Sequence, residues 1–319
     1  MRNRKNTLKL ELLVFIIFIS SCVQPTGSAT TSVLPTFTAG NASPTVTSVT
    51  TETPSPVLTV IPTLSVDDAR ERLLELLADN GDCELPCLWG IMPGKSTYQE
   101  AQTIFVPLSA LSTLTSFTPE GGAIFPIYTD GDLLLNTNAG FNADPLSDNQ
   151  IVSMVQFQAR GLKKLDDVAI DVFDSSFFKQ HLGYYMLPNV LAQHGEPTAV
   201  MLSTMAKLSS TNVPGGFKIL LLYPDQGILV NYTMQMQIEG ENIKGCPSNS
   251  HVELRLYPSG QGDSFFNRLE PSGWLQIIQN TYKPIDDATS MSKEDFYQIF
   301  SQPTDECILT PASLWPVPN

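Results

Sequence analysis

Charged residues are scarce in this chain, and positively charged ones are scarcer still. Aspartate and glutamate total 32 against 18 lysines and arginines, so the formal net charge is −14, and charged residues make up only 16% of the sequence. Binding to nucleic acid needs clusters of lysine and arginine that neutralise phosphates. Outside the N-terminus the densest basic feature is Lys163-Lys164, which Asp166 and Asp167 follow closely. We therefore exclude nucleic acid as a partner.

Recognisable catalytic motifs are also lacking. Histidine occurs only three times, and neither a His-Glu-x-x-His nor a Gly-x-Ser-x-Gly pattern is present. The letters GKST at 94–97 resemble a phosphate-binding loop, but Trp89 stands where that loop requires its first glycine. Paired aspartates fall at expected helix starts or turns, where aspartate serves as a cap; they are Asp67-Asp68, Asp166-Asp167 and Asp286-Asp287. The sequence therefore leans against an enzyme and predicts no cofactor and no metal.

No apolar run near the N-terminus approaches the roughly 20 residues that a membrane-spanning helix needs. A shorter run, residues 12–19, follows four basic residues, which is typical of a secretory signal. Residues 19–22 read Ile-Ser-Ser-Cys and resemble the lipobox of bacterial lipoproteins. That resemblance implies that 1–22 is a signal peptide and that Cys22, carrying acyl chains such as palmitate, becomes the mature N-terminus. It places the protein at the cell membrane, lipid-anchored and facing the extracellular or periplasmic side. An ordinary signal peptide is the alternative.

Residues 23–64 are mostly threonine, serine, proline, alanine and valine, with one acidic residue and no lysine or arginine. Such a segment cannot bury enough apolar surface to offset the entropy lost on ordering. We predict a disordered tether, which in an extended polyproline-like form reaches on the order of 100 Å. A stalk that carries the following domain away from the membrane and a simple spacer are equally consistent with this composition.

Residues 65–319 are predicted to form an α+β domain in which a few helices pack on an antiparallel sheet, with a subdivision near residue 165 as an alternative. Capping and apolar patterns predict helices at 66–80, 97–105 and 293–300. Alternating or β-branched runs flanked by turn signals predict strands at 123–128, 133–136, 150–160, 198–205, 217–223, 228–234 and 251–257. Two pairs of these strands are joined by short turns and predict hairpins.

Besides Cys22, the chain has four cysteines, and an even number in an exported protein predicts disulfides. We predict that Cys83 pairs with Cys87 in a small local loop, and that Cys246 pairs with Cys307. A zinc site built from all four thiolates is the alternative, but Cys246 and Cys307 have no zinc-knuckle spacing. The three residues between Cys83 and Cys87 also differ from the two of a redox Cys-x-x-Cys motif.

Three segments share a methionine near the start of an expected helix, an apolar helix face and then a proline. They lie at 91–105, 186–197 and 291–303. The second and third resemble a repeated unit of the β-lactamase-inhibitor-like domains and the small outer-membrane-assembly lipoproteins, although Ser301 replaces a glycine in the third. The resemblance implies helix pairs on an antiparallel sheet and a role in protein binding. Glycine and proline that simply end a helix and start a strand are the alternative.

Exposed aromatic side chains are the binding residues we look for, and Trp89, Trp274 and Trp315 are the candidates, although Trp89 beside a disulfide also fits a core position. Together these features predict a lipid-anchored, exported protein that is a non-catalytic binding or envelope-associated module on a stalk. Its partners are the membrane, through the anchor, and a protein or cell-envelope component. The alternative is an extracellular hydrolase of wall or polymer substrates that uses a pair of acids.

Overall fold

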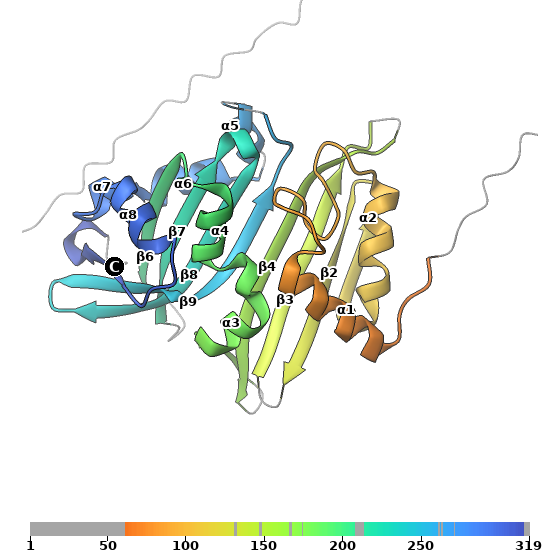
Figure 1. The fold of residues 1–319 in the computed structure, drawn as a ribbon, viewed down its shortest axis with the longest axis horizontal. Coiled ribbons are helices and arrows are strands. Elements are labelled where there is room, and N and C mark those ends of the chain that lie inside the picture. The colour runs from red at the N-terminus through yellow and green to blue at the C-terminus, as the bar shows by residue number, and fades with distance from the viewer. Residues whose placement is uncertain are drawn as a thin grey trace, which may run out of the picture. The chain divides into compact units, whose positions relative to one another are not determined.

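The computed structural model describes residues 61–315 apart from 131–132, 147–148, 166–167, 174, 208–213, 261, 263 and 271. The predicted signal peptide, Cys22 and nearly all of the predicted tether therefore lie outside the described residues. The described residues belong to one compact unit, which is built on an antiparallel sheet flanked by helices (Figure 1). This confirms the predicted α+β class.

The sheet has eleven strands among the described residues, and every pair is antiparallel. Its order is β1-β2-β3-β4-β9-β8-β7-β6-β10, while β5 pairs with β4 and β11 pairs with β9. The strands are β1 Ser112–Thr118, β2 Gly121–Asp130, β3 Leu133–Ala143, β4 Val152–Leu165, β5 Val168–Asp171, β6 Ala199–Lys207, β7 Pro214–Tyr223, β8 Ile228–Glu239, β9 Asn242–Leu256, β10 Lys283–Pro284 and β11 Ile308–Pro311.

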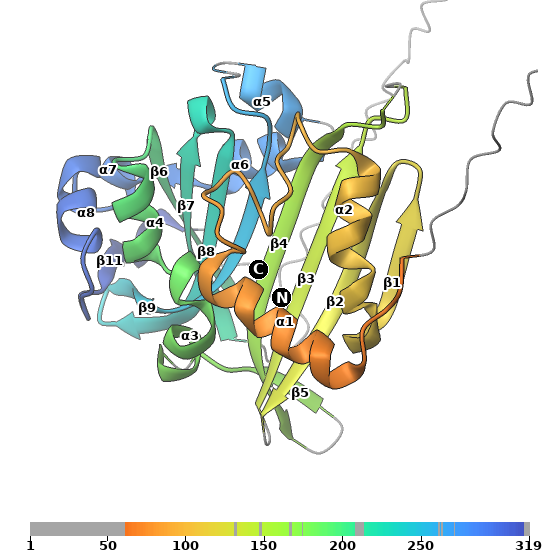
Figure 2. The same ribbon diagram turned by 45° about the vertical axis from the view of Figure 1, so that its right-hand side comes forward.

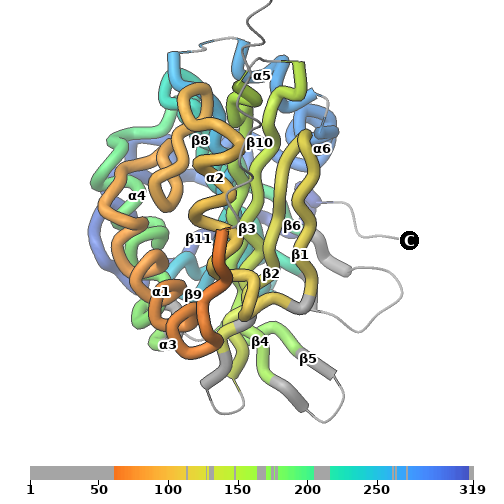
Figure 3. The backbone as a smooth tube through the Cα atoms, turned by 90° about the vertical axis from the view of Figure 1, so that its right-hand side faces the viewer, coloured from red at the N-terminus to blue at the C-terminus, as the bar shows by residue number. Residues whose placement is uncertain are grey.

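Helices cover the two faces of the sheet unequally (Figures 1 and 3). The main core lies between one face and most of the helices, and a smaller core lies between the opposite face and α5 with α6. The helices are α1 Val66–Asp79, α2 Tyr98–Phe105, α3 Ser175–Leu182, α4 Leu187–His194, α5 Ser264–Leu269, α6 Trp274–Thr281, α7 Ile285–Ala288 and α8 Lys293–Phe300. No helix of the described residues is long and apolar enough to cross a membrane.

The sheet consists mainly of two consecutive four-stranded meanders, β1 to β4 and β6 to β9. Each is preceded in the chain by a short helix, α2 or α4, and the last strands of the two meanders, β4 and β9, pair at the centre (Figure 2). Two of the three segments with a shared sequence pattern thus have the same place in the fold, directly ahead of a meander. The third forms α8, which contacts α4.

The helix ends follow the capping signals of the sequence. The side chain of Ser65 accepts a hydrogen bond from the backbone N–H of Asp68 at the start of α1, and Thr97 forms a reciprocal capping box with Glu100 at the start of α2. Ser292 caps α8 in the same way, so α8 covers the predicted 293–300. These contacts depend only on residues three apart, which is why the sequence predicts them well.

Candidate functional site

The three tryptophans predicted to be exposed binding residues are buried. Trp89, Trp274 and Trp315 are exposed by only 1%, 8% and 5%. The indole Nε1 of Trp315 donates to Thr310 Oγ1 at 3.0 Å, and the Trp274 ring lies under the Arg255 guanidinium, 5.0 Å from its centroid. The prediction that these tryptophans form a binding face is therefore wrong, because the rings complete the cores; Trp89 has the core position that its place beside a disulfide also indicated.

Both predicted disulfides are present. Cys83 pairs with Cys87, and Cys246 on β9 pairs with Cys307 just ahead of β11. The pairings occupy all four thiols that the zinc alternative required. Among the described residues, no group of three or more His, Cys, Asp or Glu side chains is placed to hold a metal ion.

The loop closed by the Cys83–Cys87 disulfide is held from inside by Asn80, which is fully buried and ends α1 in a left-handed conformation. Its Nδ2 donates to the carbonyl oxygens of Cys83 and Cys87, at 2.6 and 2.8 Å. Its Oδ1 accepts from the backbone N–H of Trp89 at 3.3 Å and from the Tyr185 hydroxyl at 3.0 Å. Asn80 therefore satisfies three backbone groups of a segment that has little regular secondary structure and joins them to the Tyr185 hydroxyl.

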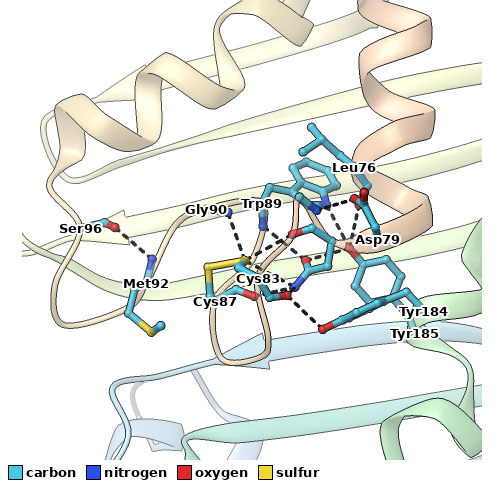
Figure 4. Close-up of a disulfide and its surroundings, with 12 residues drawn as sticks. Leu76, Asp79, Cys83, Cys87, Trp89, Gly90, Met92, Ser96, Tyr184 and Tyr185 are labelled. Atoms are coloured by element: carbon cyan, nitrogen blue, oxygen red, sulfur yellow. Dashed lines mark hydrogen bonds between the residues drawn. A yellow bond between two sulfur atoms is a disulfide. The ribbon is translucent and has the colours of Figure 1, made fainter. Parts of the chain in front are cut away.

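Tyr185 connects this loop to the rest of the core (Figure 4). Its hydroxyl accepts from the indole Nε1 of Trp89 at 3.0 Å, and its carbonyl oxygen accepts from the hydroxyl of Tyr232 on β8 at 2.9 Å. Burial raises the pKa of Tyr185 well above its usual value, so the hydroxyl stays protonated. The network has the features of a structural support, because every side chain in it already has its partners.

Two histidines are held in packed surroundings. His194 lies at the end of α4, and its Nδ1 is 2.8 Å from Gln226 Oε1, to which the protonated nitrogen donates. Its Nε2 has no hydrogen-bond partner among the described residues. His251 on β9 stacks on Phe173, with ring centroids 4.3 Å apart, and its Nδ1 lies 3.9 Å from Asp171 Oδ1. Burial lowers the pKa of both imidazoles; the hydrogen bond to Gln226 and then Glu84 oppose this at His194, and Asp171 opposes it at His251.

We expect acid to destabilise the folded protein through these two histidines. Between the lowered pKa of the folded state and the ordinary value of 6.5, the unfolded chain binds more protons. Stability is therefore fully present above pH 6.5 and is lost as the pH falls below it, by at most about 1.4 kcal/mol per pH unit for each histidine. Urea unfolding of wild type and His194→Gln at about pH 7.5 and 5.5 measures this; equal pH dependence in the two proteins would exclude His194 as a source.

The paired aspartates serve as helix-start residues where the structure describes them. Asp67 and Asp68 lie in the first turn of α1, and Asp286 and Asp287 lie in the first turn of α7. These positions suit the positive end of the helix dipole. Asp166-Asp167 lies outside the described residues. None of the described pairs faces a second acidic pair across a site, so they give no support to the acid-pair hydrolase.

A different group of polar side chains lies on the sheet face opposite the main core. On β3 and β4 the buried Thr137, Ala139, Phe157 and Ala159 point to the main core. Because side chains alternate along a strand, Asn136 and Asn138 on β3 and Gln156 and Gln158 on β4 point the other way. We call these four residues the amide face: Asn136, Asn138, Gln156 and Gln158.

Cross-strand register extends the amide face into a row that crosses four strands. Asn138 pairs with Gln158, Gln158 pairs with Glu253 on β9, and Glu253 pairs with Asn231 on β8. Gln156 likewise lies opposite Arg255, whose Nε donates to Glu253 Oε1 at 3.1 Å. The row therefore runs from neutral amides into an arginine–glutamate pair.

The row ends against α6. The hydroxyl of Tyr282, which follows α6, donates to Asn231 Oδ1 at 3.2 Å, and Trp274 on α6 lies beside the Arg255 guanidinium. The smaller core around α5 and α6 covers β6 to β8 on this face. The fully buried residues of the smaller core come from other elements than β3 and β4, and only Met154, two residues before Gln156 on β4, packs against that core at the end of the amide face.

The four amides have unused hydrogen-bonding groups. No hydrogen bond to their side-chain atoms is formed by the described residues, and Asn138 Oδ1 is buried without a partner. On β2, the half-buried Phe125 lies between Ile124, which pairs with Ala139, and Ile127, which pairs with Asn136. A lattice of amides with free donors and acceptors is a surface for recognising polar groups, not for acid–base chemistry.

The amide face was not predicted from the sequence, although a signal for it exists. Residues 133–143 read LLLNTNAGFNA, in which asparagine alternates with small or apolar residues. Such alternation indicates one wet and one buried strand face. Its significance depends on the glutamines of β4 lying beside it, which only the sheet register shows.

Comparison of the chain with protein-family models, with curated proteins and with solved structures finds no match. The resemblance to β-lactamase-inhibitor-like domains and outer-membrane-assembly lipoproteins therefore stays a prediction from short motifs. The candidate site rests on its own geometry.

Proposed function

We propose that this chain is a lipid-anchored, exported binding protein that acts without catalysis and takes up its partner on the amide face. The lipobox-like segment that ends at Cys22 supports the anchor, and the composition of residues 23–64 supports display on a tether. The observation that carries the binding role is the unused hydrogen-bonding capacity of four neighbouring, half-buried amides on one face of the sheet.

The chemistry of the face favours an extended glycan of the cell envelope. Each amide offers a carbonyl oxygen and two N–H groups, which match hydroxyl groups that both donate and accept. Same-face side chains repeat about every 7 Å along a strand, and strands lie about 4.8 Å apart. The cores of protein–protein interfaces are instead enriched in exposed aromatic residues, whereas here the three tryptophans are buried.

The anchor predicts a specific mass. Mature protein extracted from membranes is expected to begin at Cys22 and to carry acyl chains there, because two or more chains are needed for stable attachment to a bilayer. Intact-mass measurement checks this directly. A Cys22→Ser variant is expected to lose the acyl mass and to appear in the soluble fraction; an unmodified N-terminus at another residue would contradict the anchor but leave the amide face untouched.

Binding is expected to depend on the amide face. The double variant Gln156→Ala/Gln158→Ala should lower retention of the mature protein on insoluble envelope polysaccharide by about tenfold, since each lost hydrogen bond contributes about 0.5–1.5 kcal/mol. Co-sedimentation across a range of polysaccharide concentrations measures this.

The chain offers a matched control on β8. Gln235 and Gln237 have the same spacing on a strand and are exposed, but they lie on β8, away from β3 and β4. The variant Gln235→Ala/Gln237→Ala should bind like wild type. Equal retention of both double variants, with urea midpoints unchanged, would reject the amide face as the binding surface.

A further inference from the structure

We infer that Arg160 makes the amide face selective for glycans that carry carboxylate groups. This inference rests on the proposed function, because it names the class of polymer that the amide face binds. Arg160 lies on β4 two residues beyond Gln158 and pairs across the strands with Asn136. The guanidinium therefore belongs to the next row of the same lattice.

Three other arginines form ion pairs with carboxylates, whereas Arg160 forms none with the described residues. Arg70 pairs with Asp67 at 3.0 Å, Arg72 with Glu75 at 3.1 Å and Arg255 with Glu253 at 3.1 Å. Arg160 is half-buried, yet no carboxylate of the described residues lies within ion-pairing distance of it. In a chain with 32 acidic and 18 basic residues, an unpaired arginine in the middle of a sheet is unexpected.

Among the described residues, no carboxylate at ion-pairing distance compensates the charge of Arg160. Pairing of β4 with β9 ends at Ala159 and Val252, and β5 then becomes the neighbour of β4. His251 lies at this fork, and the positive charge of Arg160 is one of the causes, after burial, that lower its pKa. Asp171 at this fork faces His251, with its Oδ1 3.9 Å from the imidazole Nδ1.

A free guanidinium beside neutral amides matches a carboxylate beside hydroxyl groups. Arginine presents a rigid fork of N–H donors that binds carboxylate with two parallel hydrogen bonds. Asn136 lies in the same row as Arg160, and Gln158 lies in the adjoining row. Their amides are placed to bind hydroxyl groups of the ligand that neighbour its carboxylate. Arg160 therefore supplies the one charge-assisted contact in a lattice of neutral contacts.

The net charge of the chain sets how dense the negative charges of the ligand can be. A formal charge of −14 repels a heavily charged polyanion, and polymers with a phosphate on every unit need clusters of basic residues. A single arginine fits a chain in which neutral sugar units separate the carboxylates. We commit to that ligand class, a sparsely carboxylated polysaccharide.

The test uses two soluble polymers that share a backbone: dextran and carboxymethyl-dextran with few carboxylates per chain. Calorimetric titration of the mature wild-type protein should show about tenfold tighter binding of the carboxylated polymer. Arg160→Gln should bring the two affinities to the same level. Arg72→Gln, on the exposed side of α1, should keep the wild-type preference.

The outcomes separate the inference from the proposed function. Equal affinity of the wild type for both polymers would overturn the role of Arg160 and keep the glycan-binding face. No binding of either polymer, or a self-association that amide-face variants abolish, would overturn both. The comparison of polymers on the wild type needs no variant, so it decides the question even if Arg160→Gln fails to fold.

Discussion

Replacing Asn80 with alanine is expected to lower the free energy of unfolding by about 3–5 kcal/mol, because it removes a fully buried side chain that satisfies four polar groups. The Cys87 carbonyl oxygen and the Trp89 N–H would remain buried without their partner, whereas the Cys83 carbonyl oxygen keeps its bond from the Tyr184 hydroxyl. The left-handed backbone at this residue, with φ of 61°, adds a further cost of about 1–2 kcal/mol for any residue with a Cβ that lacks a compensating side-chain bond. Urea unfolding at neutral pH measures the loss.

A glycine variant separates the two causes. Asn80→Gly accepts the left-handed conformation but makes no side-chain hydrogen bonds. It should therefore recover about 1 kcal/mol of the loss in Asn80→Ala and remain far less stable than wild type. If the alanine variant stays within about 1 kcal/mol of wild type, the hydrogen-bond network around Asn80 has no structural importance.

Local signals account for what the sequence predicted correctly. The caps of α1, α2 and α8 join residues three apart, and the turn between β7 and β8 lies within one short segment. The disulfides followed from the even number of cysteines and the closeness of Cys83 to Cys87. All these inferences need only neighbouring residues or simple counting.

Elements fixed by long-range contacts were missed. The first half of β9 contains Gly245, and its sequence shows no strand pattern. The strand needs glycine at this residue, because a Cβ would lie 2.3 Å from Cγ of Phe217. The edge strand β1 has polar residues on both faces, and α5, α6 and α7 are short. Each acquires its structure by packing on the sheet, which a single sequence does not reveal.

The candidate site also depends on contacts between residues far apart in the sequence. Its residues belong to β3 and β4, and both strands were predicted, but β3 only for residues 133–136, which leaves out Asn138. The tryptophans were favoured because aromatic residues mark binding faces in general. Their burial depends on partners such as Thr310 and Arg255, which lie on separate strands.

The two disulfides are expected to differ in their contribution to stability by a factor of about two. Cys246 and Cys307 are 61 residues apart, whereas Cys83 and Cys87 are four apart. On the chain-entropy relation, closing these loops stabilises the folded protein by about 4 and about 2 kcal/mol. Urea unfolding of Cys246→Ser/Cys307→Ser and of Cys83→Ser/Cys87→Ser measures the two values in the same protein.

The structure gives a reason why the order should hold beyond loop length. The small loop keeps the hydrogen bonds from Asn80 to the carbonyl oxygens of residues 83 and 87 after its disulfide is removed. The larger loop ties β11 to β9, and β11 is otherwise held by its four-residue pairing and by the bonds of Thr310 to the Ala288 carbonyl oxygen and to Trp315. A greater loss from the Cys83/Cys87 variant would therefore mean that the disulfide, and not Asn80, organises the segment that leads into α2.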